Sequence, residues 1–106
     1  MKEKFSAIVD EISNSIVKPG EVINDQNYLD LEINIGERDP IKTIDTLHKI
    51  FIKVFHGYKY YRHSLKNSLD YSAFLMSQNG KFESATINIT IPEHNHQLKL
   101  TIATDN

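Results

Sequence analysis

A helical pattern of apolar residues opens the chain. Apolar side chains recur at the three- and four-residue spacing of one helix face, at Phe5, Ile8, Val9, Ile12 and Ile16. Polar residues occupy the opposite face, and Pro19 and Gly20 follow. Proline disfavours a helical residue before it, and glycine lets the backbone turn. The pattern therefore predicts a helix over residues 2–17.

A strictly alternating segment comes next, over residues 28–35. Its apolar positions are Leu29, Leu31, Ile33 and Ile35, and each is preceded by a polar residue or a tyrosine. Alternation with a period of two sends one set of side chains to a core and the other toward solvent. The segment is thus predicted to be a strand with one wet face, which favours an antiparallel sheet.

A second helix is predicted to start at Asp39 and Pro40. Asp39 can accept hydrogen bonds from free helix N–H groups, and proline at the first helical position lacks the N–H that would stay unpaired. The apolar stripe of this helix is Ile41, Ile44, Leu47, Phe51, Val54, Phe55 and Tyr58. Gly57 either ends the helix or bends it, so the end is predicted only between residues 56 and 66.

The C-terminal third is predicted to be a β-meander. Asn79-Gly80 is a strong hairpin signal between strands at 70–78 and 81–91, and a turn at 92–96 leads to a last strand at 97–102. The first of these strands is ambiguous. A two-residue loop would put Phe74 and Met76 on the inner face, but Asp70 and Ser72 as well. A bulge, or a helix running from residue 58 to 78, would remove that conflict.

These elements predict one α+β domain over residues 1–106. The order is α-β-α-β-β-β, with two helices packed on one face of an antiparallel sheet. The other face is predicted to be a free, polar and partly acidic platform on which Tyr28 is the one strongly apolar side chain. By alternation it carries Tyr28, Asp30, Glu32, Asn34, Thr86, Asn88, Thr90, Gln97, Lys99 and Thr101.

Composition limits the classes of function. The chain has 106 residues and no cysteine, which excludes disulfides, thiolate nucleophiles and cysteine-based metal sites. It has no apolar run of the length that a signal peptide or a membrane span needs. The expectation is a cytoplasmic protein that does not enter a membrane.

Charge is unevenly distributed along the chain. Between Thr46 and Leu69 there is no acidic residue, and five cations fall there: Lys49, Lys53, Lys59, Arg62 and Lys66. The remainder of the chain holds seven basic and fourteen acidic residues. This asymmetry predicts a charged partner for one part of the molecule or the other.

Candidate catalytic and metal-binding groups are weak. Glu93, His94 and His96 place two imidazoles and a carboxylate in one turn, but the sequence offers no second ligand cluster, so a polar hairpin tip is the favoured interpretation. His48, His56 and His63 lie in the acid-free stretch and are interpreted as helix residues rather than as general bases. No nucleophile elbow or phosphate loop is present. The sequence thus predicts a non-catalytic protein without a cofactor or a metal.

The leading hypothesis is a small binding protein that occludes a protein partner, in the manner of an immunity protein or an inhibitor. If the partner is a basic toxin or nuclease, the complementary charge would come from an acidic face, for which we expect Tyr28, Asp30, Glu32, Glu37 and Asp39. If the partner is acidic, the basic stretch would bind it.

The alternative is a nucleic-acid-binding accessory protein. Its cations would neutralise phosphates while a tyrosine ring stacks on a base, using Lys49, Lys53, Lys59, Tyr60, Arg62 and Lys66. A third interpretation is a ligand cavity lined by Phe51, Phe55 and Phe74, although a packed core is favoured there. The last strand, with Leu98, Leu100 and Ile102, is also a candidate sheet edge through which a homodimer would form by strand addition.

Overall fold

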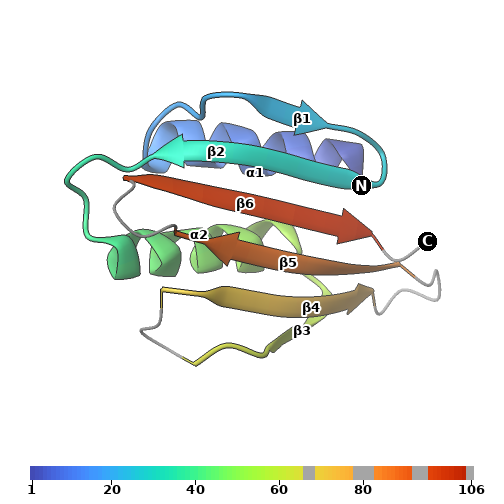
Figure 1. Ribbon diagram of the computed structural model, residues 1–106. Coiled ribbons are helices and arrows are strands. Elements are labelled where there is room, and N and C mark those ends of the chain that lie inside the picture. Colours follow the sequence, from blue (N-terminus) through green and yellow to red (C-terminus); the bar gives the residue numbers. More distant parts are fainter. Residues whose placement is uncertain (66–68, 78–82, 92–95, 105–106) are drawn as a thin grey trace.

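The computed structural model describes residues 1–65, 69–77, 83–91 and 96–104. Within these ranges the elements are α1 (Lys2–Ser15), β1 (Val22–Asn24), β2 (Tyr28–Asn34), α2 (Pro40–Val54), β3 (Tyr58–Arg62), β4 (Tyr71–Ser77), β5 (Ser84–Thr90) and β6 (Gln97–Thr104). Figure 1 shows both helices on the same side of a single sheet. The predicted α+β class and its two-layer arrangement are confirmed, and the structure adds the strands β1 and β3 to the predicted order.

The sheet has the strand order β1-β2-β6-β5-β4-β3, and every neighbouring pair is antiparallel. The last strand, β6, lies between β2 and β5, so it is an interior strand. The prediction that β6 forms a sheet edge for a homodimer is therefore wrong. The order of elements along the chain does not reveal that the last strand pairs with β2, because β2 is distant from β6 in the sequence. Both strands that hydrogen-bond to the backbone of β6 are known only from the folded sheet.

The core lies between the helices and the inner face of the sheet. Alternate residues of β2, β4, β5 and β6 are buried there, and they meet one face of each helix. The helix contributions are Phe5, Ile8 and Ile12 from α1 and Ile44, Leu47, Ile50 and Phe51 from α2. Phe51 and Phe55 are buried in this layer, whereas Phe74 lies on the opposite side of the sheet, so these three rings do not line a common cavity.

Both helices end earlier than the sequence predicts. α1 stops at Ser15, two residues before the predicted end, and the N–H groups of Ile16 and Val17 both donate to the Ile12 carbonyl. α2 ends at Val54, before the predicted range of residues 56–66, and Tyr58, predicted for its apolar stripe, lies in β3. Gly57 follows the helix with a φ of 88°. That conformation is open to glycine at little cost, so Gly57 turns the chain out of the helix and into β3. Neither of these helices is long and apolar enough to cross a membrane.

The strands β3 and β4 resolve the ambiguous segment, and the alternative of a helix from residue 58 to 78 is wrong. Phe74 pairs with Thr86 and Met76 with Ser84, which is one residue away from the register that a two-residue loop would give. A one-residue change moves every side chain to the other face of a sheet. Tyr71, Ala73 and Leu75 are consequently buried, and Phe74 and Met76 face away from the helices. The predicted Asn79-Gly80 turn lies outside the described residues.

The predicted N-cap of α2 is confirmed, and it gives a stability prediction. Asp39 Oδ1 accepts hydrogen bonds from the N–H groups of Ile41 at 2.9 Å and Lys42 at 3.4 Å. Asp39→Ala should lower the free energy of unfolding by about 1 kcal/mol, because it leaves these donors without a protein partner. Urea unfolding followed by circular dichroism measures the change. Glu37→Ala, two residues earlier in the same turn, is the matched control, and equal losses in the two variants would contradict the capping role.

Candidate functional site on the open face of the sheet

The side of the sheet away from the helices is called here the open face. It carries a row of five cross-strand neighbours, called the aromatic row, in which three side chains are aromatic. The described helices leave this face uncovered (Figure 1). Cross-strand pairing places five residues in line across it: Tyr61 of β3, Phe74 of β4, Thr86 of β5, Ala103 of β6 and Tyr28 of β2. Tyr61 is 39% exposed and Tyr28 is 37% exposed. Rings at both ends of the row are thus available to a partner.

A shallow hollow adjoins this row at the β1 side of the sheet. Its volume is about 160 Å³, and its lining is Glu21, Ile23, Asp30, Leu31, Glu32 and Lys99. Asp30 Oδ1 is shielded from solvent and accepts no hydrogen bond from any described residue. Three carboxylates against one lysine make the hollow negative. A shielded carboxylate oxygen without a hydrogen-bond donor lowers the stability of the folded protein.

The predicted acidic face is divided by the structure. Tyr28, Asp30 and Glu32 lie together on the open face of β2, as the alternation predicted. Glu37 is exposed in the turn after β2, and the Asp39 carboxylate is engaged with the first N–H groups of α2. Asp39 therefore has a capping role, which leaves its carboxylate less available to a partner.

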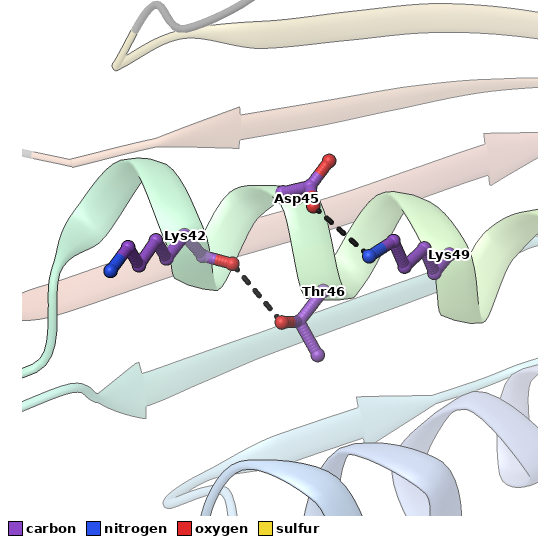
Figure 2. A network of polar contacts seen from close by, with 4 residues as sticks. All are labelled: Lys42, Asp45, Thr46 and Lys49. Atoms are coloured by element: carbon purple, nitrogen blue, oxygen red, sulfur yellow. Dashed lines mark hydrogen bonds and ion pairs between the residues drawn. The ribbon is translucent and has the colours of Figure 1, made fainter.

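The predicted basic segment is divided between the two layers. Lys49 and Lys53 lie on α2, in the helix layer. Figure 2 shows Lys49 beside Asp45, with 3.3 Å between Nζ and the carboxylate, and Thr46 donating to the Lys42 carbonyl. Lys53 Nζ lies 2.8 Å from Glu11 of α1. Both cations thus have an acidic neighbour, which in the case of Lys53 comes from a distant part of the sequence.

The strand β3 carries the other basic and aromatic residues of that segment. Lys59 is exposed on the open face, and its Nζ lies 5.4 Å from the centre of the Tyr61 ring. Tyr60 and Arg62 point to the helix side of the sheet by alternation. Arg62 covers the ring of Tyr71 at 4.8 Å and donates to Ser64 and to the Leu65 carbonyl. Lys66 lies outside the described residues.

Tyr60 belongs to a polar cluster between α2 and the sheet. Its hydroxyl is hydrogen-bonded to that of Tyr71, and the Tyr71 hydroxyl lies 2.6 Å from His48 Nδ1. Burial raises the pKa of Tyr71 to about 12, and burial together with the nearby Tyr71 raises the pKa of Tyr60 well above its ordinary value. These hydroxyls hold α2 against β3 and β4, so the Tyr60 ring is not presented for stacking on a base.

The sequence did not reveal most of the apolar content of the open face. Phe74, Met76, Tyr61 and Ile23 all lie there, whereas Tyr28 was the one strongly apolar side chain predicted for it. The relevant signal was the alternation of Tyr58, Tyr60 and Arg62 with Lys59 and Tyr61, which has the period of a strand. Because the preceding helical stripe was extended through Tyr58, this segment was not predicted to be a strand.

Glu93 and His94 of the predicted histidine turn lie outside the described residues. His96 is described, and its carbonyl accepts a hydrogen bond from the Ile35 N–H at 2.8 Å. Within the described ranges, histidine, aspartate and glutamate form no group of three that could hold a metal ion. His48 lies on α2, where it is half-buried and bonded to Tyr71. His56 and His63 are exposed and lie outside both helices, so the interpretation of these two as helix residues is wrong.

Comparison of the chain with models of protein families, with curated proteins and with solved structures found no match.

Proposed function

We propose that this protein is a cytoplasmic, non-catalytic binding protein that uses the open face of its sheet to occlude a basic surface of another protein. The observation that carries the proposal is the aromatic row from Tyr61 to Tyr28 on a sheet face that the described helices leave uncovered. Exposed aromatic side chains are the commonest anchors of protein interfaces. The role is that of an immunity protein or an inhibitor.

The charges around the row favour a basic partner. Asp30, Glu32 and Glu21 surround the hollow, and Lys99 is the one cation in its lining. An arginine or lysine of the partner would pair with the exposed Glu32 carboxylate in the lining of this hollow. A basic toxin or nuclease is the class of partner that fits this surface, since complementary charge steers association and aromatic contacts then hold the complex.

Nucleic acid is the second candidate and has less support. A polyanion would meet the carboxylates Asp30 and Glu32 on the open face, which repel phosphates. The cations Lys49 and Lys53 lie in the helix layer and Lys59 on the open face, so they do not form one continuous surface. Tyr60 is engaged with Tyr71 in the interior.

The test is an affinity capture with the whole chain as bait, from lysate of the cells that produce it. The capture is repeated with nuclease treatment and at high salt, and retained proteins are identified by mass spectrometry. We expect a protein retained near stoichiometrically in all conditions, with a basic surface. Recovery that disappears after nuclease treatment would contradict the proposal and support the nucleic-acid alternative.

Variants locate the binding face. Tyr28→Ala should weaken binding of the captured protein by about tenfold, and Glu32→Lys should slow its association and reduce the salt dependence of the rate. Titration calorimetry and stopped-flow kinetics measure the two effects. Ile52→Ala is the matched control, because Ile52 is 46% exposed but lies on α2. Equal loss in Tyr28→Ala and Ile52→Ala would argue against the open face.

A further inference from the structure

The two edges of the sheet differ in how they could pair with another strand. β1 forms one edge and has three residues, whereas β3 forms the other and has five. Figure 1 shows β3 at the margin of the sheet, beyond β4. An uncovered edge strand presents a row of backbone donors and acceptors to a further strand. The longer edge, β3, therefore has the greater capacity for strand addition.

The ladder between β3 and β4 fixes which backbone groups of β3 point outward. The His63 N–H donates to the Ser72 carbonyl at 2.8 Å, in the register that continues the pairing of β3 with β4. Hydrogen-bonded pairs alternate along an antiparallel ladder, so Tyr61 and Lys59 also bond toward β4. The backbone groups of Tyr58, Tyr60 and Arg62 consequently point away from β4. The Tyr58 N–H donates to the Phe55 carbonyl, which leaves the N–H groups of Tyr60 and Arg62 facing outward.

The side chains of β3 are self-complementary when two copies of the strand run antiparallel with Tyr60 at the centre. In that register Lys59 lies opposite Tyr61 of the second copy, and Arg62 lies opposite its Tyr58. Each cation then faces an aromatic ring, an attractive arrangement that Lys59 and Tyr61 already show within one strand at 5.4 Å. If the two strands paired with Lys59 at the centre instead of Tyr60, Lys59 would lie opposite Lys59 of the second copy, which is repulsive.

We propose that β3 is a homodimerisation edge, at which β3 of a second copy adds antiparallel with Tyr60 opposite Tyr60. The Tyr60 N–H groups then donate reciprocally to the two Tyr60 carbonyls, and each Arg62 N–H donates to the opposite Tyr58 carbonyl. The two sheets become one, and their open faces form one continuous surface. This inference shares Tyr61 with the aromatic row but uses no residue of the hollow at Asp30. Its tests use the protein alone, so either proposal can fail without the other.

The first test is the mass of the protein in solution, measured by sedimentation velocity. A contact of one short strand is smaller than the about 800 Å² per partner of a standard interface, so the dimer should be weak. We expect the mass to rise from monomer toward dimer between about 10 µM and about 1 mM. A mass that stays monomeric over this range would overturn the proposal, and assembly beyond the dimer would contradict the twofold register.

Two variants test the register against simple misfolding. Tyr61→Lys places lysine opposite Lys59 of the second copy and should keep the protein monomeric. Adding Lys59→Glu to that variant restores an attractive pair at both positions and should restore the dimer. Ile23→Lys, an equally exposed site at the β1 edge, is the control and should not affect the mass. Failure of the double variant to dimerise while the wild type does would show that another surface is used.

Disulfide formation between introduced cysteines tests the register directly. The chain has no cysteine of its own that would interfere. Lys59→Cys and Tyr61→Cys are made in separate proteins and mixed under mild oxidation. The two positions are non-hydrogen-bonded neighbours in the proposed pair, where Cα atoms lie about 4.5 Å apart and a disulfide is allowed. With the two variants at equal concentration, the mixed disulfide should far exceed the sum of the two homodisulfides. A mixed yield equal to that sum is the result of random collision and would overturn the register.

Discussion

Phe51→Ala should lower the free energy of unfolding by about 3–5 kcal/mol. Phe51 is completely buried in the face of α2 that meets the sheet, and its ring lies 5.8 Å from the ring of Tyr71. Removing the ring takes away its transfer free energy and leaves a cavity that the surrounding strands can fill only in part. A domain of this size has a stability of about 5–15 kcal/mol, so the loss is a large share of the total.

Urea unfolding followed by far-ultraviolet circular dichroism measures this loss, since the chain has no tryptophan to report by fluorescence. Ile52→Ala is the matched control on the same helix. Ile52 follows Phe51 directly and is 46% exposed, so its truncation should change the stability by no more than about 0.5 kcal/mol. Similar losses in the two variants would contradict the assignment of the buried face of α2.

Tyr71→Phe should lower the free energy of unfolding by about 1–3 kcal/mol at neutral pH. The substitution keeps the ring but removes the hydroxyl that His48 and Tyr60 share. Both remaining groups then lose the hydrogen bond to this hydroxyl in a partly buried region, and this loss is the main cost. Tyr28→Phe is the control, because its hydroxyl lies on the exposed face, and its stability should match that of the wild type within about 0.5 kcal/mol.

The pH dependence separates the hydroxyl from the packing of the ring. Folding raises the pKa of Tyr71 from 10.0 to about 12, chiefly through burial, so the native state favours the neutral hydroxyl. The resulting stability is fully present below pH 10, where the unfolded chain is also neutral, and is lost as the pH rises toward 12. The fall in stability above pH 10 should be shallower in Tyr71→Phe than in the wild type. A variant with an unchanged slope would show that Tyr71 ionises equally in both states.

Most of the alkaline loss that remains in the variant should come from the neighbouring tyrosines. The pKa of Tyr58 is also raised to about 12, first by burial and then by its hydrogen bond to the Glu83 carboxylate. Tyr58, like Tyr60, extends from β3 to the helix side of the sheet. Deprotonation of these hydroxyls should thus loosen the edge strand, and amide hydrogen exchange near pH 10–12 would locate the loss at β3.

The sequence by itself determined the elements whose signals are local. The spacing of Phe5, Ile8 and Ile12 predicted α1, and Asp39 with Pro40 predicted the start of α2 to the residue. The alternation around Leu31 predicted both β2 and the position of its acidic side chains on the open face. Each of these signals acts between neighbours a few residues apart, because a helix turn and a strand pleat repeat over that distance.

Tertiary structure decided whatever depends on which strands become neighbours. The insertion of β6 beside β2 made β3 a sheet edge, and a pairing register one residue from the expected one brought Phe74 and Met76 to the open face. Folding also divided the continuous basic segment between two layers and placed Glu11 beside Lys53. Pairing partners and registers are chosen by contacts between residues far apart in the chain, where a shift of one residue exchanges the faces of a strand. For that reason the acidic strand could be predicted, whereas the aromatic row across the sheet and the position of β3 at the edge of the sheet could not.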